Sequence, residues 1–87
     1  MIAYVLYNKD TAAERVATDL LERLKREQLE AELLDADSAR GIQLAEHYDV
    51  MGRPAVLLLR EDGSPVQIWQ GEDGLPMPSD VGYLARQ

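Results

Sequence analysis

The sequence predicts an α/β fold in the order β-α-β-α-β-β-α, with a four-stranded mixed sheet and helices on both faces. Two observations carry most of this prediction. An unbroken apolar segment at residues 4–7 precedes a long amphipathic helix, and an Asp-Gly pair at residues 62–63 separates two later strand-like segments. The chain has 87 residues, of which 46% are hydrophobic. This size and composition predict a single domain that spans residues 1–87.

The first strand is predicted at residues 4–7, where apolar side chains follow one another as in a central strand covered on both faces. A helix follows. Thr11 and Glu14 have the spacing of a capping box, in which each side chain satisfies a free backbone N–H group. Apolar residues then recur at three- and four-residue steps and define one buried face: Ala13, Val16, Ala17, Leu20, Leu21 and Leu24.

The second strand is predicted at residues 30–35, where the alternating pattern suits a strand near the edge of the sheet. A strand, a helix and a second strand make a βαβ unit, so the first two strands are expected to be parallel. Asp37 or Ser38 can cap a second helix, which runs from residue 39 to about residue 48. Its expected inward side chains are Ile42, Leu44, Ala45 and Tyr48.

A hairpin is predicted from residues 55–60 and 65–70, joined through the turn at residues 61–64. In the outer strand, Val66 and Ile68 are expected on one face and Gln67 and Trp69 on the other. A loop with two glycines and two prolines follows. Ser79 or Asp80 is then expected to cap a short last helix that reaches residue 85.

Composition and charge narrow the class of protein. The chain contains no cysteine, so neither disulfides nor thiolate metal sites are available. Its formal net charge of −7 repels phosphate backbones. Residues 1–7 lack the basic start and longer apolar run of a signal peptide, and no segment approaches the roughly 20 apolar residues of a membrane span. We therefore expect a cytoplasmic protein that binds neither nucleic acid nor membrane and uses no metal or cofactor.

The segment that ends at Pro54 carries a family resemblance. Residues 44–54 end in an X-Pro turn that runs directly into the apolar strand at residues 55–59, and the Asp-Gly hairpin follows. This arrangement resembles the cis-proline region of thioredoxin-like proteins. The order of elements matches that family over nearly the whole chain. The resemblance implies a thioredoxin-like fold with a cis bond between Arg53 and Pro54.

The usual activity of that family needs a thiolate at the start of the first helix. The corresponding stretch here, residues 9–14, contains no cysteine, and neither does the rest of the chain. Thiol–disulfide exchange by this chain alone is therefore excluded, and no catalytic residue is predicted.

What the resemblance leaves is the groove around the cis-proline. In the family, the residue before that proline offers its backbone to an extended peptide or to glutathione. The matching residue is Arg53. We therefore expect a non-redox binding or regulatory module that contacts a protein or peptide. The expected surface includes the loop after the outer strand and six residues: Lys9, Asp10, Thr11, Arg53, Pro54 and Trp69.

The role of the Arg53 side chain has two interpretations. Together with Lys9 and the start of the first helix, it could form a small cationic spot for a carboxylate or a phosphate. The alternative is a surface arginine that pairs with Asp49 or Asp10, as exposed charges commonly do.

A second functional hypothesis is a protein that binds glutathione or another thiol ligand. Tyr7 ends the first strand, where some glutathione transferases carry a tyrosine that activates the glutathione thiol. Ser79 and Asp80 resemble the spot at which such folds hold the glutamyl end of glutathione. The plainer interpretation is a core tyrosine and a helix cap. The site implied by this hypothesis comprises Tyr7, Arg53, Ser79 and Asp80.

Other chemistry-bearing residues favour structural roles. His47 is the only histidine, and no second ligand or triad partner accompanies it. Asp35 and Asp37 could bind a divalent ion weakly, but a strand end and a helix cap explain them as well. Trp69 either marks an exposed contact at the sheet edge or packs against the last helix.

Overall fold

Four strands form one mixed sheet in the order β2-β1-β3-β4. The computed structural model describes residues 1–87. β1 pairs in parallel with β2 and antiparallel with β3, and β3 pairs antiparallel with β4. The elements are β1 (Ile2–Tyr7), α1 (Ala12–Arg26), β2 (Ala31–Asp35), α2 (Ala39–His47), β3 (Ala55–Leu59), β4 (Pro65–Gln70), the 3₁₀ helix η1 (Glu72–Gly74) and α3 (Pro78–Ala85). The predicted element order, the mixed sheet and the edge position of the second strand are confirmed.

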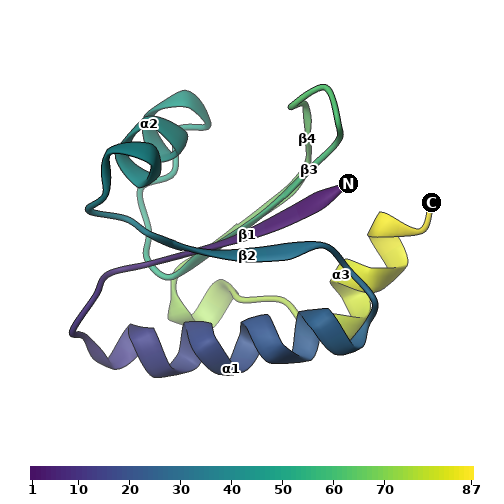
Figure 1. The fold of residues 1–87 in the computed structure, drawn as a ribbon, viewed down its shortest axis with the longest axis horizontal. Coiled ribbons are helices and arrows are strands. Elements are labelled where there is room, and N and C mark those ends of the chain that lie inside the picture. The colour runs from purple at the N-terminus through teal and green to yellow at the C-terminus, as the bar shows by residue number, and fades with distance from the viewer.

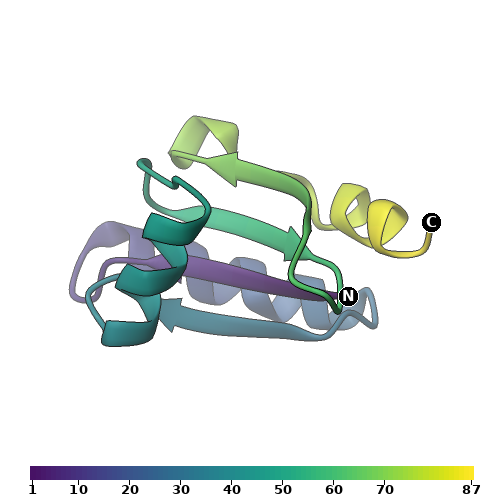
Figure 2. The ribbon, with the colours of Figure 1, turned by 90° about the horizontal axis from the view of Figure 1, so that it is seen from above.

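Helices cover both faces of this sheet, as predicted. α1 and α3 lie on one face and α2 lies on the other (Figure 1). Seen from above, α2 covers one end of the sheet and α3 lies toward the opposite end (Figure 2). No helix is both long and apolar enough to span a bilayer.

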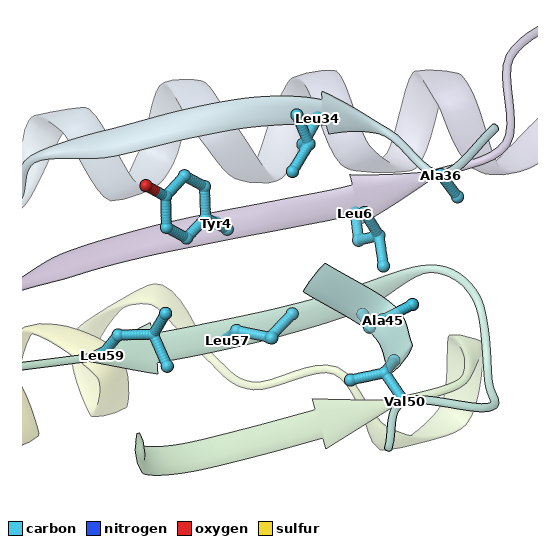
Figure 3. Close-up of a cluster of buried hydrophobic side chains, with 9 residues drawn as sticks. Tyr4, Leu6, Leu34, Ala36, Ala45, Val50, Leu57 and Leu59 are labelled. Atoms are coloured by element: carbon cyan, nitrogen blue, oxygen red, sulfur yellow. The ribbon is translucent and has the colours of Figure 1, made fainter. Parts of the chain in front are cut away.

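The alternation of side chains along β1 and β3 divides the core into two clusters. On the α2 face, Tyr4 and Leu6 of β1 meet Leu57 and Leu59 of β3, together with Ala45 of α2 (Figure 3). On the α1 and α3 face, the intervening strand residues pack against the two helices. That second cluster contains Ala3, Val5, Ala17, Leu20, Leu24, Val56, Leu58 and Val81.

The first turn of α1 differs from the predicted capping box. Thr11 occupies the N-cap position, but its hydroxyl donates to the backbone carbonyl of Asn8 at 2.6 Å and caps nothing in the helix. The Glu14 carboxylate accepts from the backbone N–H of Asp10 at 3.1 Å. Because Asp10 adopts a left-handed conformation with φ 62°, its N–H, rather than that of Thr11, reaches Glu14. The two side chains therefore fasten the preceding loop.

The start of α2 follows the prediction closely. Ser38 is the N-cap residue, and its hydroxyl oxygen accepts from the backbone N–H of Gly41 at 3.0 Å. Gly41 is buried, and a Cβ there would lie 2.0 Å from the carbonyl oxygen of Asp35. The glycine thus permits close approach of α2 to the end of β2. Ile42 is 46% exposed, so its predicted inward position is wrong: it lies on the outer side of the helix.

β4 contains an irregularity that the sequence pattern did not predict. Its register against β3 shifts between Leu58 and Leu59. Because a bulge moves subsequent side chains to the other face, Val66 packs in the α1 and α3 cluster while Ile68 packs against the α2 cluster. The expectation that these two side chains share a face is wrong. Trp69 is half-buried and packs in the α1 and α3 cluster.

The last helix begins at least two residues earlier than predicted. Pro78 is its first residue and Met77 its N-cap, so Ser79 and Asp80 lie inside the first turn and neither is the cap. Proline suits this position, because its fixed φ matches the helix and its missing N–H would have had no partner there. The buried residues of α3 are Val81 and Gly82.

Candidate functional site

The candidate site lies where β1 ends and β3 begins. Leu6 pairs with Ala55, so the loop after β1 and the turn before β3 leave the sheet side by side. The bond between Arg53 and Pro54 in this turn is cis. Pro54 is buried, whereas Arg53 is partly exposed. The turn therefore presents Arg53 at the end of the sheet next to the loop of residues 8–11.

The turn is held by the end of β4. The side-chain oxygen of Gln70 accepts from the backbone N–H of Met51 at 2.8 Å and from that of Gly52 at 3.0 Å. The N–H of Gly71 donates to the carbonyl of Pro54 at 2.9 Å. Sequence reasoning missed Gln70, because a single glutamine at the end of a strand has no sequence pattern that predicts two hydrogen bonds to a distant loop.

The backbone of Arg53 is the unpaired part of this turn. Neither its N–H nor its C=O makes a hydrogen bond within the protein, although its neighbours on both sides are bonded. Backbone groups normally find partners, in the protein or in water. The turn therefore offers one free donor and one free acceptor on a partly exposed segment whose neighbours on both sides are hydrogen-bonded.

The Arg53 side chain lies toward α2. Its Nη1 donates to the carbonyl of Val50 at 3.4 Å, and its Nε is buried without a partner. It forms no ion pair, so the expected pairing with Asp49 or Asp10 is wrong: the two ion pairs of the structure join Arg40 to Glu32 and Arg86 to Glu27.

The loop of residues 8–11 approaches the turn from the other side, because it leads to α1 on the face opposite α2 (Figure 1). Lys9, Asp10 and Thr11 are exposed there. The structure therefore brings the backbones of the two segments together but directs the Arg53 guanidinium away toward α2. Lys9 does not line the hollow that contains Arg53, and a cationic spot shared by the two side chains stays a prediction.

Asp35 and Asp37 build the loops at this end of the sheet. Asp35 Oδ1 accepts from the backbone N–H of Asp37 at 2.9 Å, and Asp37 Oδ2 accepts from the side-chain amide of Asn8 at 3.5 Å. Asn8 is a further loop residue that sequence reasoning missed. Both carboxylates thus have a structural explanation.

The residues of the alternative glutathione site are spread over the molecule. Tyr7 is half-buried and packs in the α1 and α3 cluster. Ser79 and Asp80 are exposed in the first turn of α3. Residues 75–78, just before them, lie against the middle of α1. From there α3 extends toward the end of the sheet that lies away from α2 and from the turn at Arg53 (Figure 2). They do not line the hollow that contains Arg53.

His47 is exposed at the end of α2. Its ring lies edge-on to that of Tyr48, with 4.6 Å between the ring centroids. Trp69 is the last of the predicted site residues. It lies on the α1 and α3 face of the sheet and packs against the core cluster there.

Comparison with solved structures identifies the fold. The chain resembles thioredoxin 1 from the thermophilic eubacterium Thermosipho africanus TCF52B, with a TM-score of 0.69 and 13% identity over 99% of this chain and 91% of that one. A malarial protein of known structure gives a TM-score of 0.69 and 17% identity over 98% of this chain and 92% of that one. No family model and no curated protein matches the sequence. The chain thus has a thioredoxin-like fold and contains no cysteine.

Proposed function

We propose that this chain is a non-redox binding module that holds an extended segment of a partner protein or peptide at the cis-proline turn. The observation that carries the proposal is the unpaired backbone of Arg53, whose N–H and C=O have no partner in the protein. An extended peptide can bond to both groups in the manner of an added strand. No thiolate is needed for this function, which agrees with the absence of cysteine.

The support for the turn favours such a role. The backbone groups before Arg53 are bonded to Gln70, and the carbonyl of Pro54 is bonded to Gly71. A binding edge that is already ordered loses little conformational entropy when a peptide binds. The turn is thus a prepared site rather than a mobile loop that must order on binding.

The first experiment is a selection of random decapeptides displayed on phage against the folded chain, followed by an amide-resolved NMR titration with the selected peptides. We expect the largest shifts at Gly52, Arg53 and Ala55. Peptides that shift only the outer edge of β2, or a selection that yields no binder, would contradict the proposal.

A matched pair of variants tests the role of the turn. Gln70→Ala removes both bonds to the turn and is expected to weaken peptide binding about tenfold, which corresponds to one or two neutral hydrogen bonds. Gln67→Ala, in the same strand, removes an exposed side chain without hydrogen bonds and is expected to leave binding unchanged. Equal affinities of the two variants would show that the turn is not the binding element.

Reduced glutathione is the probe for the alternative. A site made from Tyr7, Arg53, Ser79 and Asp80 would produce shifts in β1, the turn and α3 together. The separation of α3 from the turn leads us to expect no such common set at millimolar glutathione. A common set of shifts would favour the glutathione hypothesis over the peptide proposal.

A further inference from the structure

A hollow of about 260 Å³ lies beside the cis-proline turn, between α2 and the segment that follows it. Buried Ala45 and Val50 form its apolar floor. Two large apolar side chains at its margin remain in solvent: Ile42 is 46% exposed and Met51 is 82% exposed. Arg53, the residue with the unpaired backbone, lines the same hollow. An apolar depression thus adjoins the free backbone groups.

The charges around this hollow are mainly acidic. Glu46 and Asp49 line it, both are exposed, and neither forms an ion pair. The one basic side chain in the lining is Arg53, which donates to the Val50 carbonyl rather than to a carboxylate. The chain as a whole carries a formal charge of −7. A ligand with a cationic group would therefore be attracted to this margin, whereas an acidic ligand would be repelled.

We infer that the hollow selects the partner segment: it receives one apolar side chain of an extended peptide, and Glu46 and Asp49 receive a lysine or arginine two positions away. The spacing follows from strand geometry, because side chains two apart in an extended peptide lie on the same face. This inference rests on the proposed function, since the backbone of that peptide is the one held by Arg53.

Three acetylated, amidated heptapeptides test the inference. The first has leucine at its third position, lysine at its fifth and threonine or alanine elsewhere. The second replaces the leucine with serine, and the third replaces the lysine with glutamate. We expect the first peptide to shift the amides of Ile42, Met51 and Arg53. The other two should bind about tenfold more weakly or worse, as expected for the loss of one buried apolar contact or one charge pair.

Variants of the protein test the same contacts from the other side. Ile42→Ser is expected to weaken binding of the leucine and lysine peptide about tenfold. Tyr83→Ser is the matched control, because Tyr83 is 63% exposed and lies on α3, on the opposite face of the sheet. Glu46→Gln should reduce affinity for the lysine peptide and flatten its dependence on salt. Ile42 and Glu46 are both exposed on α2, so the Ile42→Ser and Glu46→Gln variants are expected to fold.

The outcomes separate this inference from the proposed function. Equal affinity of all three heptapeptides, or indifference to Ile42→Ser and Glu46→Gln, would overturn the selectivity inferred here. So would the absence of heptapeptide binding when phage-selected peptides still shift the Arg53 amide. In each of these cases the proposed function survives. If no peptide of either kind shifts Arg53, the proposed function itself fails.

Discussion

Replacement of Gly41 by alanine tests the close approach that positions α2 at the end of the sheet. A Cβ at this position would lie 2.0 Å from the carbonyl oxygen of Asp35 and 3.0 Å from the Cα of Ala36, both backbone atoms that cannot swing away. Ordinary contact begins near 3.4 Å, so α2 and the end of β2 must separate by roughly 1 Å or more. The same carbonyl accepts from the Ser38 hydroxyl at 2.6 Å, and that bond would be strained as well.

The expected magnitude follows from three effects. Overpacking of a tight contact costs about 1–3 kcal/mol. Weakening of the Ser38 hydrogen bond costs about 1 kcal/mol. Alanine in place of glycine in a helix returns about 1 kcal/mol. We therefore expect Gly41→Ala to lower the free energy of unfolding by about 2 kcal/mol, or the melting temperature by about 10 °C for a domain of this size.

Gly82→Ala is the matched control for this prediction. Gly82 is also a buried helical glycine, but an added Cβ would meet only the ends of the Glu27 and Arg86 side chains, at 2.8 and 3.1 Å. Those ends can move, so this variant is expected to be neutral or slightly more stable. Urea unfolding of both variants measures the difference. If Gly41→Ala is as stable as Gly82→Ala, the close approach of α2 does not depend on the glycine, and the reasoning is refuted.

Three further predictions concern local hydrogen bonds. Ser38→Ala removes the α2 cap and is expected to cost about 1 kcal/mol in urea unfolding; no change would mean that the cap is dispensable. Tyr48→Phe removes the hydroxyl that donates to the Gly63 carbonyl and ties α2 to the hairpin, and a loss of about 1 kcal/mol is expected by the same measurement. Hydrogen bonds from the serine two residues on lower the pKa of Asp62. That stabilisation is complete above the unfolded-state pKa, near pH 4, and disappears as pH falls through the lower folded-state pKa. Asp62→Asn should therefore reduce the loss of stability between pH 5 and pH 2. If the variant loses as much stability over this pH range as the original chain, the lowered pKa of Asp62 does not contribute to stability.

Much of the architecture could be predicted because it depends on local pattern. The apolar run of β1, the amphipathic face of α1 and the Asp-Gly turn each encode one element within a short window. Ser38 was also among the predicted caps, because a cap depends on its own first turn. The predictions that Thr11 and Ser79 cap their helices through a side-chain hydrogen bond are wrong, because neighbouring residues changed the local geometry. In one case the preceding loop took the hydroxyl, and in the other Pro78 started the helix earlier.

The candidate site was predicted less completely, since it joins segments that are distant in sequence. The resemblance pointed to Arg53 and Pro54, but not to the direction of the guanidinium or to the support from Gln70. The apolar residue type of Ile42 predicts an inward position. Its exposure follows from the rotation of α2 against the sheet, which no short window encodes.

The sequence by itself determined the order of the elements, the polarity of their faces and the exclusion of thiol chemistry. These properties depend on residue type and spacing, and the last one requires only the absence of cysteine. The tertiary structure decided which backbone groups stay unpaired at Arg53 and that an acidic, apolar hollow lies beside them. Both features arise where α2, the cis-proline turn and the end of β4 meet. A surface made of such long-range contacts exists only once the chain is folded.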